Sequence, residues 1–144
     1  FDDWVRSDKY DMTILPFHTS IFKNPTTQFL DKNGLSIIIS SPEQAFLECL
    51  HLVPDYYNYM DLYYIMEQLT SLDSDNVQTA LENTSSQRVK RMFLYMAEKA
   101  GHYWFDMLDT DKFELTTSKL KLVNNGVYNS KYRITVPKEL NDYE

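Results

Sequence analysis

The sequence predicts an α+β fold in which short strands near the two ends form a small sheet packed against a central cluster of about four helices. Residues 12–39 and 119–136 are rich in β-branched and aromatic residues with turn signals between them, whereas 42–108 carries apolar residues at helical spacing. Strands grouped before and after a run of helices favour α+β over an alternating α/β sheet. The length of 144 residues suits one domain with a buried core.

The first 40 residues predict short strands. Residues 12–22 mix β-branched, aromatic and polar residues and are interrupted by Pro16. A second strand is expected at 28–31, and the turn residues 32–34 lead into a third at 35–39. The uninterrupted isoleucine triplet in this last segment predicts burial on both of its faces.

Three helices are expected between residues 41 and 83. The first begins at Ser41, with Pro42 at the first helical position and Gln44 at the third, the spacing of a capping box, and Pro54 ends it. The second is expected over 59–69 and the third over 74–83. The positions predicted to be buried are Ala45, Phe46, Cys49, Leu50 and Val53, then Tyr59, Leu62, Ile65, Met66 and Leu69, then Val77, Ala80 and Leu81.

A fourth helix is predicted between a cap at Ser86 and a left-handed terminus at Gly101. Its apolar stripe is Val89, Phe93, Met96, Ala97 and Ala100, and its polar coverage is Arg88, Arg91, Glu98 and Lys99. A short helical turn is expected at 102–108. Strands follow at 119–123 and 132–136, with a hairpin-type turn at 124–126 between them and a stop at Pro137.

The charge is distributed unevenly along the chain. The formal net charge is −7, from 14 basic and 21 acidic residues, which argues against a broad phosphate-gripping surface. Residues 1–87 contain 4 basic and 13 acidic residues, and residues 88–144 contain 10 and 8. An anionic partner would therefore find favourable charge only in the later part of the chain.

Residue types that carry catalysis are not arranged in catalytic patterns. The single cysteine, Cys49, lies in an apolar helical stripe, the three histidines are far apart, and the three glycines are isolated. We therefore expect no catalytic residues, no metal, no cofactor and no enzymatic activity. The single cysteine fits a reducing cytoplasm, and no apolar run is long enough to cross a bilayer.

Two other hypotheses about the function remain open. The tyrosines at 56–64 have acidic neighbours, which favours helix packing with a partly exposed tyrosine face over base stacking. Such a face allows a scaffold or dimerisation module. Alternatively, Asp109, Asp111 and Glu114 allow a metal-dependent phosphodiesterase, although a solvated capping loop, which also includes Asp106, is the favoured interpretation.

A basic patch with aromatic edges is the preferred binding site. It would combine the fourth helix with a late strand lying beside it, and arginine suits bidentate capture of carboxylate or phosphate. A solvated helix face is the alternative explanation of the same charges. The patch consists of Arg88, Lys90, Arg91, Lys99, His102, Trp104, Lys131 and Arg133.

Several segments carry a family resemblance. SSPEQAFLECLHLVP (40–54), VKRMFLYMAEKAGHYWF (89–105) and KYRITVPKEL (131–140), with DDW (2–4) and EQLTSL (67–72), resemble the C-terminal domain of AbiEi-family antitoxins. These are transcriptional regulators of AbiE abortive-infection toxin–antitoxin systems. The resemblance departs at 115–121, where the family tends to have a glycine-rich stretch and this chain reads LTTSKLK.

The resemblance implies a role and partners. It makes residues 1–144 a single C-terminal antitoxin domain of a longer, cytoplasmic protein whose N-terminal winged helix-turn-helix, which binds operator DNA, is absent from this chain; the start at Phe1 fits that expectation. The domain would neutralise a nucleotidyltransferase-like toxin encoded beside it and support operator repression in phage defence. Direct contact with the toxin and homodimerisation stay open, and no membrane partner is implied.

Overall fold

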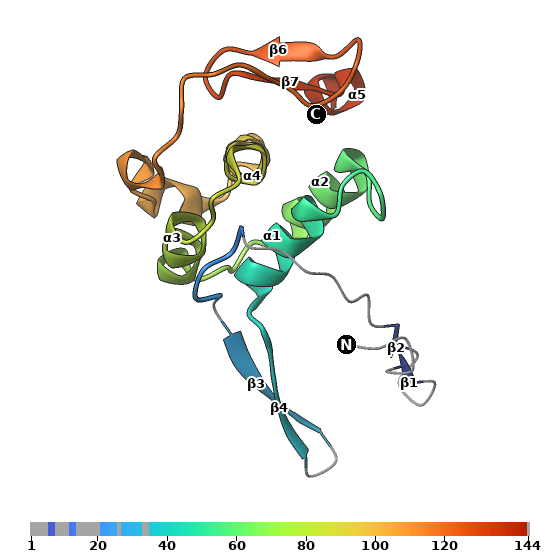
Figure 1. The fold of residues 1–144 in the computed structure, drawn as a ribbon, viewed down its shortest axis with the longest axis vertical. Coiled ribbons are helices and arrows are strands. Elements are labelled where there is room, and N and C mark those ends of the chain that lie inside the picture. The colour runs from blue at the N-terminus through green and yellow to red at the C-terminus, as the bar shows by residue number, and fades with distance from the viewer. Residues whose placement is uncertain (1–5, 8–11, 14–20, 26, 33–34, 144) are drawn as a thin grey trace.

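The structure is a computed structural model that describes residues 6–7, 12–13, 21–25, 27–32 and 35–143. It confirms the α+β class: a body of packed helices carries a small sheet on one side, and two short antiparallel strand pairs extend from the other (Figure 1). The helices are α1 (Pro42–His51), α2 (Tyr59–Gln68), α3 (Ser74–Glu82), α4 (Gln87–Ala100) and α5 (Lys138–Asp142), with 3-10 turns η2 (Tyr103–Met107) and η3 (Thr110–Phe113).

Strands in the described ranges form three separate sheets. They are β1 (Arg6–Ser7), β2 (Met12–Thr13), β3 (Thr27–Lys32), β4 (Leu35–Ser40), β5 (Leu120–Lys121), β6 (Val127–Asn129) and β7 (Ile134–Val136). The first four form two antiparallel pairs, β1 with β2 and β3 with β4, and the last three form a mixed sheet in the order β5-β7-β6. The expected single sheet, shared by strands from both ends of the chain, is therefore wrong in this detail.

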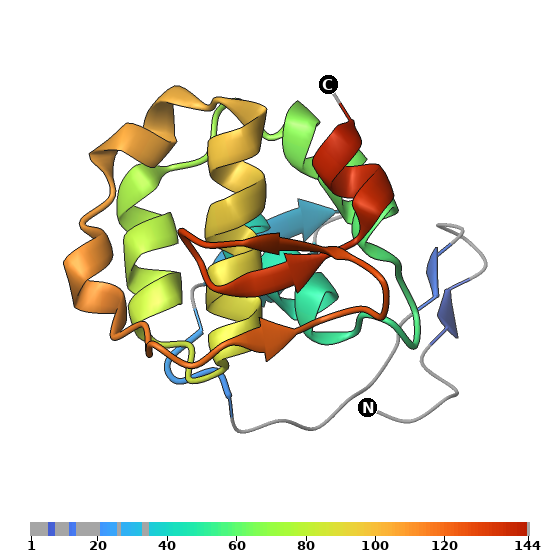
Figure 2. The ribbon, with the colours of Figure 1, turned by 90° about the horizontal axis from the view of Figure 1, so that it is seen from above.

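The helix α4 is the centre of the core. It contacts α1, α2 and η2, and the C-terminal sheet lies across it (Figure 2). Because neighbours surround it, seven of its residues between Val89 and Ala97 are buried apolar side chains. The apolar stripe that the sequence predicts is present, but burial continues around most of the helix. No helix in the described part of the chain has the length and apolarity to cross a bilayer.

The helix starts follow the local capping signals. Ser41 Oγ accepts a hydrogen bond from the backbone N–H of Gln44 at 3.2 Å, and Ser86 Oγ accepts one from Val89 at the same distance. Gly101 ends α4 with a φ of 75°, a left-handed conformation in which a side chain is strained. The predicted N-caps at Ser41 and Ser86 and the predicted C-terminus at Gly101 are confirmed.

Burial in α2 differs from the prediction at one position. Ile65 was expected in the apolar stripe, but it is 47% exposed, and Tyr63 is buried instead. Tyr59, Leu62, Tyr63 and Met66 follow the i, i+3, i+4, i+7 spacing of a single helix face. Ile65 falls outside that face, so the prediction for Ile65 was wrong. The predicted burial of Val77, Ala80 and Leu81 in α3 is confirmed.

The C-terminal sheet also corrects the predicted hairpin. The turn at 124–126 joins β5 and β6, but these two strands do not pair, because β7 lies between them. The parallel pairing of β5 with β7 is held by Leu120 N–H donating to the Arg133 carbonyl and Leu122 N–H donating to the Thr135 carbonyl. Gly126 lets the chain before β6 pass close to β7, since a Cβ at this position would collide with the Val136 carbonyl oxygen.

Part of the N-terminal prediction lies outside the described residues. The strand expected at 12–22 is described only as β2 and an isolated bridge between Phe22 and Thr84. The strands expected at 28–31 and 35–39 are confirmed as β3 and β4, with Lys32 opposite Leu35. The turn residues 33–34 and the side chains of the isoleucine triplet fall outside the described part. The short helix α5, which follows Pro137, was not predicted.

Candidate functional site

Arg88 of α4 points into the protein and caps a neighbouring helix. Its guanidinium donates hydrogen bonds to the carbonyl oxygens of Leu50 at 3.0 Å and His51 at 3.1 Å. These carbonyls close α1, where the helix dipole places partial negative charge and the backbone lacks intrahelical donors. The arginine therefore joins α4 to the C-terminal end of α1.

Lys90 and Arg91 are buried cations that bind the end of η3 and the chain segment after it. Lys90 is 4% exposed and donates to the Phe113 carbonyl at 2.6 Å. Arg91 is 1% exposed and donates to the carbonyls of Ser118 at 2.5 Å and Thr116 at 2.8 Å, and also to the Thr116 hydroxyl. Burial lowers the pKa of both side chains. The expectation that Arg91 covers the polar face of α4 was wrong.

His102 and Trp104 close the C-terminal end of α2. The ring nitrogen Nε2 of His102 lies 2.6 Å from the Met66 carbonyl oxygen, and Trp104 Nε1 donates to the Leu69 carbonyl at 2.9 Å. The two rings stack with their centroids 5.2 Å apart, and both residues are buried. Their contacts in the folded chain are internal.

The eight residues predicted as one partner-binding patch therefore divide into two groups. Arg88 is half-buried against α1, and Lys90, Arg91, His102 and Trp104 are buried, so these five do not form a shared exposed surface. Lys99 is half-buried, with its ammonium 3.4 Å from the Asn141 carbonyl oxygen and 5.9 Å from the centre of the Tyr63 ring. Lys131 and Arg133 are exposed. A role in partner binding stays a prediction for these last three.

The segment between Glu114 and Glu139 is free of acidic residues in a chain that is acidic as a whole. It contains five basic residues, Lys119, Lys121, Lys131, Arg133 and Lys138, all exposed. This segment forms the C-terminal sheet. The sheet lies across α4 (Figure 2). Ile134 and Val136 of β7 are buried, so the opposite face of the sheet presents its side chains to solvent.

The strand register shows which side chains share the outer face. Ile134 and Val136 of β7 are buried, so the intervening Thr135 lies on the opposite face. Thr135 is paired with Lys121 on β5 and with Tyr128 on β6, and cross-strand partners project from the same face. Lys121 and Tyr128 are both exposed, in agreement with this assignment.

Two further cations border this row. The ammonium of Lys119 lies 5.4 Å from the centre of the Tyr128 ring, within the range of a cation–π contact. Arg133 donates to the Thr117 carbonyl at 3.3 Å and remains exposed. We call Lys119, Lys121, Tyr128, Thr135 and Arg133 the basic sheet face. Sequence reasoning identified only Arg133 among them, although the acid-free segment together with strand alternation would have indicated the others.

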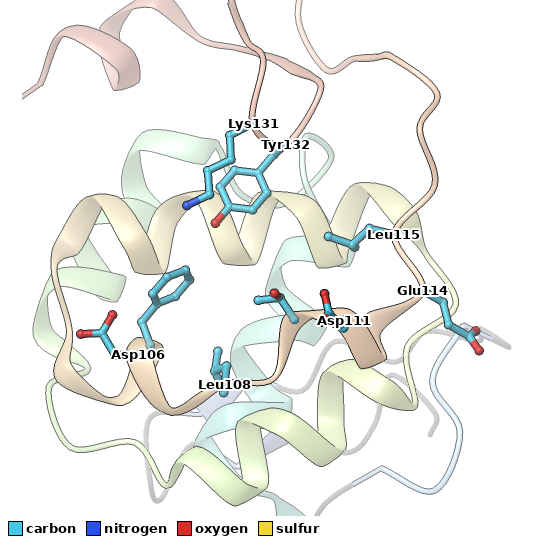
Figure 3. A pocket seen from close by; sticks show the side chains of 9 residues that line it. Asp106, Leu108, Asp111, Glu114, Leu115, Lys131 and Tyr132 are labelled. Atoms are coloured by element: carbon cyan, nitrogen blue, oxygen red, sulfur yellow. The ribbon is translucent and has the colours of Figure 1, made fainter.

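A cleft of about 570 Å³ lies beside the sheet, between η2–η3 and the loop before β7 (Figure 3). Asp106, Asp111 and Glu114 line it on the η2–η3 side, and Lys131 and Tyr132 line it on the other. Its exposed carboxylates repel phosphate, so the cleft limits the surface that an anionic partner can use.

The same carboxylates bear on the phosphodiesterase alternative. Figure 3 shows the side chains of Asp111 and Glu114 pointing in different directions. Within the described ranges, no three His, Cys, Asp or Glu side chains gather as a metal ion requires. Asp109, Asp111 and Glu114 thus do not form the ligand set that this alternative needs.

A three-residue network joins α4 to the loop before β7. Tyr132 donates its hydroxyl to Glu98 Oε1 at 2.6 Å, and the Lys131 ammonium lies 2.6 Å from Glu98 Oε2. Burial alone would raise the pKa of Glu98, but the hydrogen bonds from Lys131 and Tyr132 and the charge of Lys131 lower it overall. Burial and the bond to Glu98 raise the pKa of Tyr132.

The network predicts a pH dependence of stability. Because the folded state depresses the pKa of Glu98 below its ordinary value of 4.5, the ionised carboxylate stabilises the fold above that pH. This contribution is lost as the pH falls through the depressed value. We expect Glu98→Gln to lower the midpoint of urea unfolding near neutral pH. At acidic pH the difference in midpoint between this variant and wild type should become smaller. The control is Glu82→Gln, at an exposed glutamate of α3. If its difference in midpoint from wild type shrinks equally at acidic pH, the role given to Glu98 is contradicted.

The tyrosine face of the scaffold alternative is partly present. Tyr56 is 60% exposed and Tyr64 is 48% exposed, while Tyr59 and Tyr63 are buried in the core. Tyr64 also contacts the ring of Tyr143 edge-on, with centroids 5.5 Å apart. The expected mixture of helix packing and a partly exposed tyrosine face is confirmed, whereas a dimer through this face stays a prediction.

Comparison with known proteins identifies the family. No curated protein and no solved structure matches the chain. A family model described as transcriptional regulator, AbiEi antitoxin, type IV toxin–antitoxin system matches residues 1–137. This match covers the helical core and the C-terminal sheet with its basic face. The chain therefore belongs to the AbiEi antitoxin family of type IV toxin–antitoxin transcriptional regulators.

Proposed function

We propose that residues 1–144 act as the antitoxin domain of an AbiE-type abortive-infection system in the cytoplasm. In this proposal the domain neutralises a nucleotidyltransferase-like toxin and supports operator repression, while a separate winged helix-turn-helix domain binds the operator. It works by non-covalent recognition and carries out no reaction. Family membership supports the regulatory role.

The basic sheet face is the observation that carries the proposed mechanism. Its cations stand in a segment without acidic residues, although the chain has a net charge of −7. A local basic surface on an acidic protein attracts an anionic partner at that surface and repels it elsewhere. The cations of α4, half-buried Arg88 and buried Lys90 and Arg91, already donate hydrogen bonds within the fold, which favours the basic sheet face as the recognition surface.

Charge reversal on the sheet tests the proposal. In cells expressing the toxin encoded beside the antitoxin, the double variant Lys119→Glu/Lys121→Glu is expected to lose most of the rescue from growth arrest. Both side chains are exposed, so the folded structure should remain, as checked by circular dichroism and the unfolding midpoint. The measurement is colony formation with full-length antitoxin at matched protein levels.

The matched control reverses two exposed lysines elsewhere. Lys23→Glu/Lys112→Glu makes the same change in net charge, but Lys23 precedes α1 and Lys112 lies on η3 beside Asp109. This control should rescue like wild type. Full rescue by Lys119→Glu/Lys121→Glu, or equal loss in both variants, would remove the basic sheet face from the mechanism.

A scaffold function is the second candidate, favoured by the exposure of Tyr56, Tyr64 and Ile65. It predicts a concentration-dependent dimer that Tyr64→Lys weakens, and rescue that does not respond to charge reversal on the sheet. Sedimentation equilibrium of wild type and Tyr64→Lys separates this candidate from the preferred one.

A further inference from the structure

We propose that the basic sheet face binds single-stranded RNA, with Tyr128 as the stacking residue. This inference rests on the proposed function, because it names the anionic partner of that same face.

Tyr128 and Lys119 together form a site for one nucleotide. The ring is 43% exposed on the outward side of β6, so one base can stack on it without movement of the core. Every base offers a π-face, which makes such stacking independent of sequence. The ammonium of exposed Lys119 lies over this ring, 5.4 Å from its centre, so a base that stacks there displaces it and the ammonium then pairs with the phosphate of that nucleotide.

The row across the three strands continues this site. Lys121 lies on the other side of Thr135 from Tyr128, because both residues pair with Thr135 in register. Neighbouring strands are about 4.8 Å apart, so the row from β6 to β5 spans about 10 Å. This distance suits two or three nucleotides, with Lys121 on a second phosphate. The Thr135 hydroxyl in the middle of the row can donate to and accept from a ribose 2′-hydroxyl, which favours RNA over DNA.

Duplex DNA fits this face poorly. The bases of a duplex are stacked on one another and cannot reach the Tyr128 ring. Affinity for duplex DNA comes largely from phosphate contacts, and duplex-binding proteins can make about 6–10 of them, whereas the described face has three cations, Lys119, Lys121 and Arg133. The cleft with Asp106, Asp111 and Glu114 lies beside the sheet and opposes extension of a phosphate backbone in that direction (Figure 3).

Fluorescence anisotropy with labelled oligonucleotides tests the inference on this chain. The probes are a 12-nucleotide unstructured RNA, DNA of the same sequence, and the corresponding DNA duplex, each at low salt. We expect the RNA to bind best and the duplex to bind weakest. Tyr128→Leu should weaken RNA binding about 5- to 150-fold, the effect of losing one stacked base. Lys121→Gln should reduce the slope of log affinity against log salt by about 0.7, the value for one phosphate contact on a single strand.

Tyr64→Leu is the matched control, because Tyr64 is another exposed tyrosine but lies on α2. It should bind the RNA like wild type. Unchanged RNA binding by Tyr128→Leu, an equal loss in Tyr64→Leu, or tighter binding of the duplex or of the single-stranded DNA would overturn the inference.

The outcome is separable from that of the proposed function. If the chain does not bind RNA but Lys119→Glu/Lys121→Glu loses rescue, the inference is wrong and the proposed function stands with another anionic partner. If RNA binding depends on Tyr128 but the double variant rescues fully, the RNA site stands and its role in antitoxicity is wrong.

Discussion

Replacing Arg91 with methionine is expected to lower the free energy of unfolding by about 3 kcal/mol, because it removes several hydrogen bonds to a charged group, each worth about 1.5–3 kcal/mol. The guanidinium is 1% exposed and is the donor to the carbonyls of Thr116 and Ser118 and to the side chain of Gln87. Methionine fills a similar volume but removes the guanidinium donor from the Thr116 and Ser118 carbonyls, whereas Gln87 Oε1 still accepts from the Thr116 backbone N–H.

Urea denaturation followed by far-ultraviolet circular dichroism measures this effect. Arg133→Met is the matched control, because it removes the same group from an exposed position with one hydrogen bond at 3.3 Å. We expect the control to lie within about 1 kcal/mol of wild type. If Arg91→Met unfolds at the same urea concentration as Arg133→Met, the interior role of Arg91 is wrong.

The Arg91 result also decides how charge variants are interpreted. A charge reversal at Arg91 would abolish rescue of toxin-expressing cells by unfolding the domain, with no information about recognition. The residues suited to testing recognition are exposed cations such as Lys119 and Lys121, whose substitution leaves the core intact. Loss of rescue has meaning only together with an unchanged unfolding midpoint.

Local signals in the sequence were sufficient for helices α1 to α4, though not for the short helix α5. The starts of α1 and α4 depend on a side chain and a backbone N–H three residues apart, as at Ser41 and Ser86, so a short stretch of sequence contains the whole interaction. The α+β class followed from the order of these segments. The strand order did not, because the turn at 124–126 is typical of a hairpin and β7 enters between β5 and β6 from a later part of the chain.

The predicted patch and the basic sheet face share the later part of the chain, but several of the predicted side chains are buried on α4 rather than exposed. Uneven charge indicated residues 88–144, and the cations of α4 then seemed exposed because polar side chains usually cover a helix. Arg91 is buried because its acceptors at 116–118, more than 20 residues away, fold over it. Helical periodicity does not contain that information. On the sheet, register alone brings Lys121 and Tyr128 into one row.

Trp104→Ala is expected to destabilise the domain by about 3–5 kcal/mol, the range for removing a large buried aromatic side chain. Trp104 is fully buried, stacks on His102 and lies 5.9 Å from Phe93 between ring centroids. Alanine would leave a cavity among these rings and an unpaired carbonyl at Leu69, which ends α2. Both losses reduce the packing of α2 against α4, and urea unfolding followed by circular dichroism measures the sum.

Two further variants separate the causes. Trp104→Phe keeps most of the aromatic volume but removes the Nε1–H donor, so it should cost less than alanine and still leave the Leu69 carbonyl unpaired. Tyr103→Ala removes the neighbouring ring, which is 65% exposed, and should change stability by less than about 1 kcal/mol. Equal unfolding midpoints for Tyr103→Ala and Trp104→Ala would contradict the burial of Trp104. If Trp104→Phe loses rescue while its unfolding midpoint is unchanged, Trp104 takes part in partner binding. A purely structural side chain cannot affect rescue without affecting folding.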